Sequence, residues 1–184
     1  MMTTYISILR GINVGGHKMV NMEVLRQLYS DLGFANVQTY IQSGNILFQC
    51  RTTSAEALSA SIGRAIVAAF GFEVPVLVME SSDLKEIVQN NPFVSDRHED
   101  IAHLHVTFLS AEPPSVQLQN ESFRPDEFVI RDKVVYLFCP KGYGNTKLNN
   151  NFLEQKLHVT ATTRNWKTTV ELLNKAIKLF EGNK

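Results

Sequence analysis

The apolar and polar positions of the first 80 residues predict strands and helices in the order βαββαβ. The apolar stretch 3–10 predicts a strand, and the following helix is capped by Asn21 and ended by Gly33. The apolar positions of this helix recur at helical spacing: Leu25, Leu28 and Leu32. Two β-rich stretches, 37–41 and 45–50, then flank Gln42–Gly44, which predicts a hairpin in which Gly44 can take a positive φ.

A second helix and a fourth strand complete this pattern. A capping box, Thr53–Glu56, opens the helix, and residues 74–79 predict the strand. The apolar positions of the helix and the glycine that ends it are Leu58, Ile62, Ile66, Ala69 and Gly71. Two long crossovers and one hairpin in this order form the split βαβ, or ferredoxin-like, arrangement, with two helices on one face of a four-stranded sheet.

The second half of the chain reads as a looser copy of the first. Its first predicted elements are a helix from Ser82 to near Pro92, a strand at 103–109, and a polar connection with a helical turn after Pro113 and Pro114. A hairpin of 128–130 and 134–138 follows, and then a helix opened by Asn145 or Thr146 that carries Leu148, Phe152 and Leu157. The last elements are a short strand at 159–162 and a helix with Val170, Leu173, Ile177 and Phe180 on one stripe. We therefore expect an α+β fold of two related ferredoxin-like halves, 1–80 and 81–184, with antiparallel-rich sheets covered by helices.

Composition is that of an ordinary globular protein. Hydrophobic residues make up 44% of the 184 residues and charged residues 20%, so the chain can bury a core. No apolar run reaches the roughly 18 residues that a membrane span needs, and the N-terminus does not resemble a secretory signal. The two cysteines, Cys50 and Cys139, form no CxxC pattern, so we expect reduced thiols and a cytoplasmic protein.

Charge is balanced overall but unevenly distributed. The formal net charge is zero, which argues against general nucleic-acid binding. Residues 80–132 hold 11 acids and 4 basic residues, whereas residues 141–184 hold 8 basic residues and 3 acids. The basic end could meet a phosphate or an acidic partner, which includes the acidic middle of a second copy; alternatively its lysines lie on solvated helix faces.

The segment Arg10–Lys18 (RGINVGGHK) offers the most distinctive candidate site. Strand, glycine-rich turn and helix in this order can hold an anion, because glycine lets backbone N–H groups converge on it. We expect Arg10, Asn13, Gly15, Gly16 and Lys18 to contact a ligand. The spacing fits neither a P-loop nor G-x-G-x-x-G, so ATP and dinucleotides are disfavoured. The glycines could instead serve only a turn that needs positive φ.

Three further polar segments could contribute to the same site. Gln42, Ser43 and Asn45 offer amides and a hydroxyl at the hairpin, although turn chemistry explains them equally. Arg164 could form a bidentate contact with a carboxylate or phosphate or could be a structural pin, and Asn165 could cap the last helix. A second glycine-rich loop, 140–147, ends at Lys147, so two such loops could face one groove if the halves are pseudo-symmetric.

The sequence predicts no metal, cofactor or catalytic residue. His103 and His105 share one face of a strand, and His98, Glu99 or Asp100 could join them, but no third ligand has a recognised spacing. Trp166 could be a stacking platform or a core anchor. Catalysis would need a base, for which His17 beside the glycine-rich loop is the only candidate.

Several of these motifs together resemble the DUF1697 family of uncharacterised bacterial proteins. The matching segments are residues 9–16, residues 39–45 with Phe48, residues 136–148 with Pro140, Gly142 and Lys147, and residues 163–166. The resemblance implies an α+β fold of two ferredoxin-like halves. It implies no activity and no catalytic residue.

Three functions remain open. The first is a binding module for a small anionic ligand or, with weaker support because the strands lack an RNP1-type aromatic run, a nucleic-acid segment. The second is an enzyme acting on a phosphorylated small molecule. The third is a protein-interaction or dimerisation domain. We expect no membrane partner.

Overall fold

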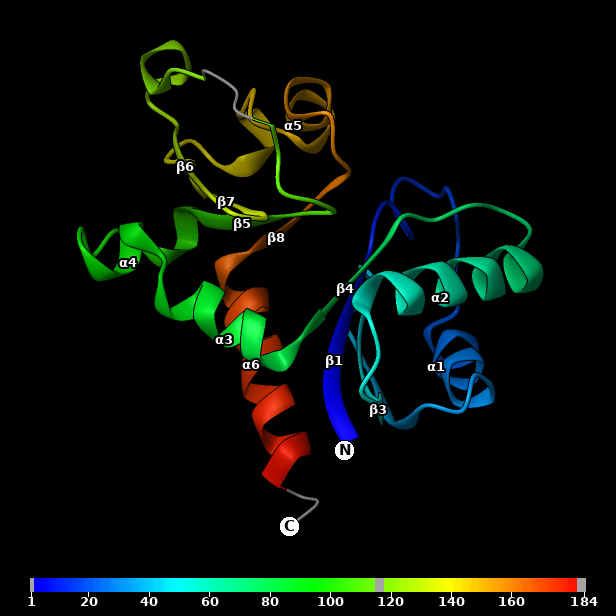
Figure 1. The fold of residues 1–184 in the computed structure, drawn as a ribbon. Helices are drawn as coiled ribbons and strands as arrows, with labels where there is room; N and C mark the ends of the chain where they lie inside the picture. The colour runs from blue at the N-terminus through cyan, green and yellow to red at the C-terminus, as the bar shows by residue number, and fades with distance from the viewer. Residues whose placement is uncertain (1, 115–117, 182–184) are drawn as a thin grey trace. The chain divides into compact units, whose positions relative to one another are not determined.

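A computed structural model describes residues 2–114 and 118–181, and its chain forms two compact units. Unit 1 comprises Met1–Lys85 and Leu172–Lys184, and unit 2 comprises Glu86–Glu171. Each unit contains one four-stranded antiparallel sheet and helices, so the α+β class and the antiparallel sheets predicted from the sequence are found (Figure 1). Among the described residues, no helix is both long and apolar enough to cross a membrane.

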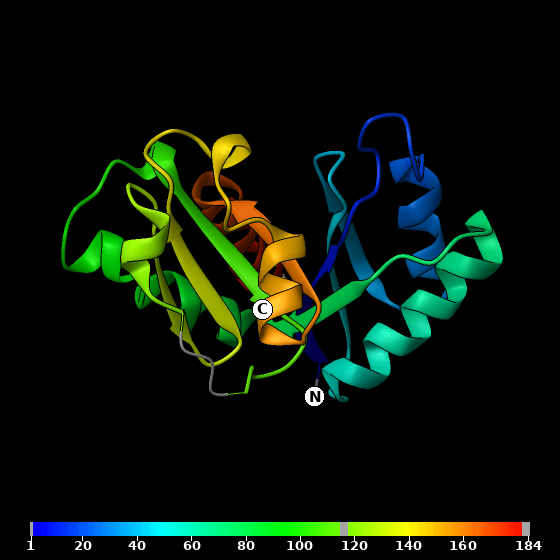
Figure 2. The ribbon, with the colours of Figure 1, turned by 90° about the horizontal axis from the view of Figure 1, so that it is seen from above.

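Unit 1 has the element order that the sequence predicts. The elements are β1 (Met2–Leu9), α1 (Met22–Asp31), β2 (Ala35–Tyr40), β3 (Asn45–Arg51), α2 (Ala55–Phe70) and β4 (Val76–Glu80). The strand order in the sheet is β2-β3-β1-β4, and β1 pairs with both β3 and β4. Figure 2 shows α1 and α2 on the same face of this sheet.

Both faces of the unit 1 sheet are covered. Alternate β1 residues Tyr5 and Leu9 join the core beneath α1 and α2, where the Phe48 ring stacks on Phe34 at 4.5 Å. The opposite face contacts the C-terminal part of α6 (Trp166–Glu181), because Gln49 Nε2 donates to the Leu179 carbonyl at 3.4 Å. The β1–β3 pair is therefore packed against α1 and α2 on one face and contacts α6 on the other.

Unit 2 has a strand order that matches that of unit 1. Its elements are the last part of α3 (Ser81–Gln89), α4 (Pro92–Ser95), η1 (Ile101–His103), β5 (Leu104–Leu109), η2 (Asn120–Phe123), β6 (Glu127–Arg131), β7 (Val134–Phe138), η3 (Tyr143–Asn145), α5 (Asn150–Leu157), β8 (Ala161–Asn165) and the start of α6. The strands lie in the order β6-β7-β5-β8. The predicted connection after Pro114 falls in part on residues 115–117, outside the described residues.

Some predicted helix boundaries are wrong. The cap of α2 is Ser54, whose side chain accepts from the Ala57 N–H, rather than Thr53. The helix predicted to open at Asn145 or Thr146 begins instead after the cap Asn149. Leu148 is fully buried but precedes α5, because a 3-10 turn leads the chain into the core.

Other differences lie at the C-terminal end. The predicted strand 159–162 begins later and includes Arg164, because residues 161–165 pair with β5. On α6, Leu173 is buried as predicted, whereas Phe180 remains 57% exposed. Trp166 is buried, which confirms its role as a core anchor.

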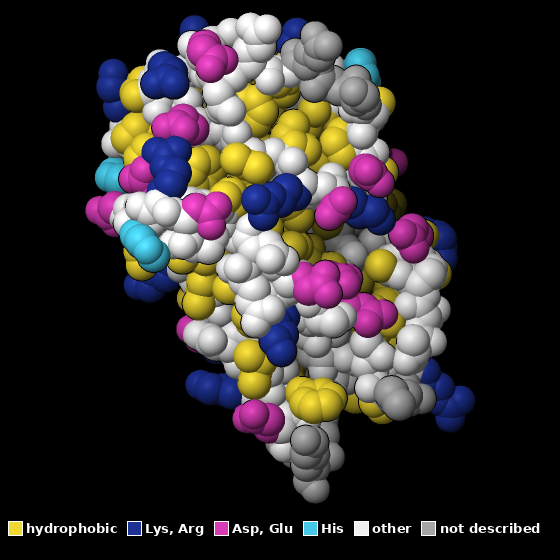
Figure 3. Space-filling view, turned by 60° about the vertical axis from the view of Figure 1, so that its left-hand side comes forward, with side chains coloured by type: hydrophobic (Ala, Val, Ile, Leu, Met, Phe, Trp, Pro, Cys, Tyr) yellow, Lys and Arg dark blue, Asp and Glu magenta, His cyan; other side chains and the backbone are white. Residues whose placement is uncertain are grey.

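Charges on the viewed surface are mixed rather than segregated. Figure 3 shows Lys and Arg side chains interspersed with Asp and Glu on the face that it presents. In unit 2, Arg97 contacts Glu127 at 2.6 Å and also pairs with Glu99. The uneven charge along the sequence therefore does not produce a patch of one sign on this face.

Candidate functional site

The glycine-rich segment of unit 1 folds into a tight hairpin. The His17 N–H donates to the Val14 carbonyl at 3.0 Å, and the Asn13 N–H donates to the Lys18 carbonyl at 3.2 Å. Gly15 and Gly16, the central residues, have φ of 58° and 76°, as a type I′ turn requires. Turn geometry therefore explains these glycines, while the hairpin also exposes their backbone and the side chains of His17 and Lys18.

Asn13 fixes the base of this hairpin. Its Oδ1 accepts from the Val20 N–H at 2.8 Å, and its Nδ2 donates to the Val20 carbonyl at 3.1 Å. The same Nδ2 also donates to the Gln42 carbonyl at 2.9 Å, which ties the hairpin to the β2–β3 turn. Asn13 itself has a φ of 55°, a conformation that asparagine tolerates better than most residues.

The β2–β3 turn packs closely against the end of β1. Gly44 is buried with a φ of 79°, and the Leu9 N–H donates to its carbonyl at 2.8 Å. Asn45 is fully buried, and its Nδ2 donates to the Tyr40 carbonyl at 3.1 Å and to Ser43 Oγ at 3.0 Å. Gln42, Ser43 and Asn45 therefore shape the turn, and the structure brings them next to the Asn13–Lys18 hairpin.

Lys18 extends from the hairpin to the backbone of a residue that lines a pocket in unit 1. Its Nζ donates to the Glu73 carbonyl at 2.7 Å. Glu73 lines a pocket of about 540 Å³ between α2 and the segment that leads into β4. The lining residues are Ala60, Gly63, Arg64, Val67, Glu73, Val74 and Pro75. The sequence pattern indicates Lys18 but none of the pocket residues.

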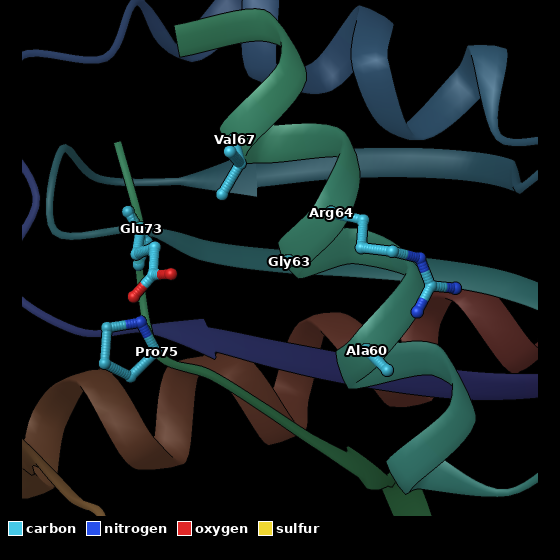
Figure 4. Close-up of a pocket in the computed structure, with 7 residues that line it drawn as sticks. Ala60, Gly63, Arg64, Val67, Glu73 and Pro75 are labelled. Carbon is cyan, nitrogen blue, oxygen red and sulfur yellow. The ribbon is translucent and has the colours of Figure 1, made fainter. Parts of the chain in front are cut away.

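The pocket has an apolar floor and a charged rim. Figure 4 shows Val67 pointing from α2 toward the segment that carries Glu73 and Pro75. The Glu73 carboxylate faces the hollow, whereas the Arg64 guanidinium points away from Glu73. Of the two charged lining residues, Glu73 is thus the one that faces the hollow, and Lys18 bonds its backbone carbonyl.

Arg10 lies on the opposite side of the unit 1 sheet from α1 and α2. Its N–H donates to the Pro75 carbonyl at 3.0 Å, which continues the β1–β4 ladder. Side chains alternate between the two faces along β1, so Arg10 follows Ile6 and Ile8 on the face away from α1 and α2. On this face Lys175 lies over the Tyr40 ring at 5.2 Å, so α6 brings a second cation to the same sheet face.

The second glycine-rich loop lies in unit 2 and covers one face of its sheet. Gly142 has a φ of 86°, and Asn145 Nδ2 donates to the Lys141 carbonyl at 2.7 Å. Lys147 is exposed. The Tyr143 hydroxyl donates to Thr163 Oγ1 at 3.0 Å, which anchors the loop to β8.

Beneath this loop is a partly buried polar network. Thr163 Oγ1 lies 2.7 Å from Thr107 Oγ1 and donates to Asn150 Oδ1 at 2.7 Å. The His105 ring stacks on Tyr143 with a centroid distance of 4.9 Å. No described residue forms a hydrogen bond with His105 Nδ1. Burial lowers the pKa of His105, so the imidazole is neutral at pH 7.

We expect His105 to make unit 2 less stable in acid. The unfolded chain protonates this histidine near pH 6.5 and the folded chain only at lower pH. The unfolded state therefore binds more protons, and the free energy of unfolding falls as the pH drops below about 6.5. Urea unfolding measures the free energy of unfolding at about pH 7.5 and at about pH 5.5. This free energy should fall less for His105→Phe, which keeps the stack on Tyr143, than for the wild type. Equal losses in both proteins would contradict this assignment.

Arg164 and Asn165 lie on opposite faces of β8. Arg164 pairs with Val106, and Thr163 pairs with Thr107 beneath the loop, so Arg164 faces away from the Lys147 loop. Its Nη1 donates to the Thr163 carbonyl at 2.9 Å, and burial lowers the pKa of Arg164 to about 10. Asn165 Oδ1 accepts from the Thr168 N–H at 2.8 Å, so the predicted helix cap is confirmed.

Histidines and acids do not assemble a metal centre in the part of the chain that the structure describes. No group of three or more His, Cys, Asp or Glu side chains is placed to hold a metal ion there. His103 instead packs edge-on against Phe138 at 6.3 Å, and Glu99 pairs with Arg97. Structural contacts therefore account for His103 and Glu99.

Comparison with known proteins identifies relatives without an assigned activity. Residues 2–136 match the family described as "Protein of unknown function (DUF1697)". A solved structure of a conserved bacterial protein, SP0830 from Streptococcus pneumoniae, is similar with a TM-score of 0.73 and 24% identity, over 96% of this chain and 99% of that one. No curated protein matches the chain. At this identity the similarity concerns the fold alone.

Proposed function

Because the chain belongs to the DUF1697 family, whose description assigns no function, its activity has to be inferred from its own residues, and we propose that it is a binding module for a small anionic ligand. The ligand would bind at the Asn13–Lys18 hairpin of unit 1. Lys18 would contact its phosphate or carboxylate, and the exposed N–H groups of Gly15 and Gly16 would add hydrogen bonds.

The position of Lys18 is the observation that carries this proposal. Its ammonium lies 2.7 Å from the Glu73 carbonyl at the edge of a pocket of about 540 Å³. An ammonium has three N–H donors, so the bond to Glu73 leaves others for a ligand. Pockets of this size with a few placed polar groups are the usual sites of small-molecule binding.

The charge of the hairpin segment itself supports an anion rather than a cation. Residues 1–22 contain no Asp or Glu, whereas they contain Arg10, His17 and Lys18. Asn13, Gln42 and Asn45 would support the site by fixing the hairpin and the adjacent turn, since their side chains or carbonyls already bond one another or neighbouring backbone. Ligand contact would then fall to Lys18 and the hairpin backbone.

Removing the ammonium tests the proposal directly. Thermal unfolding is followed in increasing inorganic phosphate at constant ionic strength, because a ligand that binds only the folded state raises Tm. We expect Lys18→Gln to weaken phosphate binding about three- to tenfold, the effect of one exposed charged hydrogen bond. The control is Lys156→Gln, an exposed lysine on α5 of unit 2, which should leave binding unchanged. No phosphate-dependent rise in Tm, or equal effects of both variants, would refute the proposal.

We further infer that the two units are related ferredoxin-like halves. Supporting this, the strand orders β2-β3-β1-β4 and β6-β7-β5-β8 are the same order shifted by four strands. The helix α2 before β4 corresponds to α5 before β8. In unit 2 a connection with η2 stands where unit 1 has α1. Strand order and connection order together define the ferredoxin-like arrangement.

A further inference from the structure

The residues that line the pocket beside Lys18 indicate the chemistry of the rest of the ligand. Resting on the proposed function, we propose that this pocket holds the flat apolar body of the same anionic ligand, and that Glu73 accepts a hydrogen bond from an N–H or O–H group on it. The ligand class is thus a small aromatic or other ring compound with a phosphate, sulfonate or carboxylate and a hydrogen-bond donor.

A separate stripe of α2 faces this pocket. Ala60, Gly63, Arg64 and Val67 are spaced three, four and seven residues apart, so they share one side of the helix. A neighbouring stripe, Leu58, Ile62 and Ile66, fills the core of unit 1. Three members of the pocket stripe, Ala60, Gly63 and Val67, are small or apolar. They are not part of that core, and Val67 is 41% exposed.

Gly63 indicates that the floor of the pocket is kept flat. A glycine inside a helix costs about 1 kcal/mol relative to alanine. Packing does not require it, because a Cβ at Gly63 would meet no atom within 4 Å, and its φ is not positive. A side chain at this position would, however, occupy the pocket that Gly63 lines. A flat ring lying against α2 is the ligand shape for which this glycine matters.

Two polar groups at the rim orient the ligand. The Lys18 ammonium lies at the Glu73 carbonyl, and the Glu73 carboxylate faces the hollow between α2 and residues 73–75 (Figure 4). An anionic group is favoured beside Lys18 but repelled by the Glu73 carboxylate, which accepts a donor instead. The pocket therefore selects a ligand whose anionic group and donor lie at different positions on the ring.

Anilinonaphthalene sulfonate (ANS) is a suitable probe, because it combines aromatic rings, one N–H donor and a sulfonate. Binding is measured by ANS fluorescence and located by amide chemical shifts in a two-dimensional NMR spectrum of the full chain. In the wild type we expect saturable binding with shifts concentrated at residues 60–67, 73–74 and 15–18. Shifts confined to other residues would overturn the proposal.

Filling the pocket provides the decisive variant. Gly63→Leu should bind ANS at least about tenfold more weakly while its Tm stays equal or rises, because leucine favours the helix. The matched control is Ala68→Leu, an exposed position of α2 outside the pocket, which should keep ANS binding. Wild-type ANS affinity in Gly63→Leu would overturn the proposal.

Phosphate separates this inference from the proposed function. Gly63→Leu leaves the Asn13–Lys18 hairpin intact, so it should bind inorganic phosphate as the wild type does. Unchanged ANS binding in Gly63→Leu together with normal phosphate binding would overturn the pocket assignment alone. Absence of phosphate binding in the wild type would overturn the proposed function, on which the pocket assignment rests.

Discussion

Gly44→Ala is expected to lower the free energy of unfolding of unit 1 by about 2–5 kcal/mol. An added Cβ would lie 2.8 Å from Leu9 Cβ and 2.8 Å from Ile12 Cδ1. Neither atom can retreat easily, because Leu9 and Ile12 are buried in the core. The positive φ of 79° adds about 1 kcal/mol of backbone strain for alanine.

Gly33→Ala is the matched control for this substitution. Gly33 ends α1 with a φ of 84°, but a Cβ there would meet nothing within 4 Å. Gly33→Ala should therefore lower the free energy of unfolding only by the backbone strain, about 1 kcal/mol. Urea unfolding of both variants separates strain from packing. Equal losses would show that the close approach of the β2–β3 turn to β1 does not determine its stability.

Asn13→Ala is expected to lower the free energy of unfolding by about 2–3 kcal/mol and to abolish phosphate binding. The variant loses the two bonds to Val20 and the bond to the Gln42 carbonyl, and it places alanine at a φ of 55°. Without these bonds the hairpin that presents Lys18 is no longer fixed. Urea unfolding measures the stability, and the phosphate dependence of Tm measures the binding.

The control for Asn13 is another asparagine of unit 1 in the same backbone region. Asn36 has a φ of 53°, and its Nδ2 donates to Gln49 Oε1 at 2.6 Å. Asn36→Ala carries similar backbone strain, but Asn36 lies on β2 and its side chain bonds Gln49 rather than the hairpin. It should keep phosphate binding. Full phosphate binding by Asn13→Ala would show that the hairpin does not form the site.

Much of unit 1 could be predicted because its signals are local. The Asn21 cap accepts from the Glu23 and Val24 N–H groups, as its place before a helical pattern indicates. Gly44 takes the positive φ that the hairpin required. Each of these features depends on residues within a few positions of one another, and such features are encoded in short sequence patterns.

The start of α5 could not be predicted because tertiary packing overrides the local pattern. Leu148 has helical spacing with Phe152, but its N–H donates to Thr146 Oγ1 and its side chain fills the core before the helix starts. Similarly, Arg164 lies in an irregular polar stretch, and only pairing with Val106 makes it part of a strand. Neither contact is visible from spacing alone.

The candidate site was only partly predictable for the same reason. Lys18 and Asn13 were identified because they flank glycines, yet the main role of Asn13, bonding Val20 and Gln42, needs the folded turn. The pocket residues were missed because Gly63 and Val67 lie on α2 beside its core stripe. A sequence pattern cannot separate a stripe that faces a pocket from one that faces the core.

A phosphate titration followed by amide chemical shifts tests the proposed anion site most directly. At constant ionic strength, we expect saturable shifts of the Gly15, Gly16 and Lys18 amides in the wild type, and a phosphate midpoint about three- to tenfold higher in Lys18→Gln. The second glycine-rich loop, at Gly142 and Gly144, provides an internal reference that should not shift. Shifts at that loop with none at residues 15–18, or no saturable shift at all, would contradict the account.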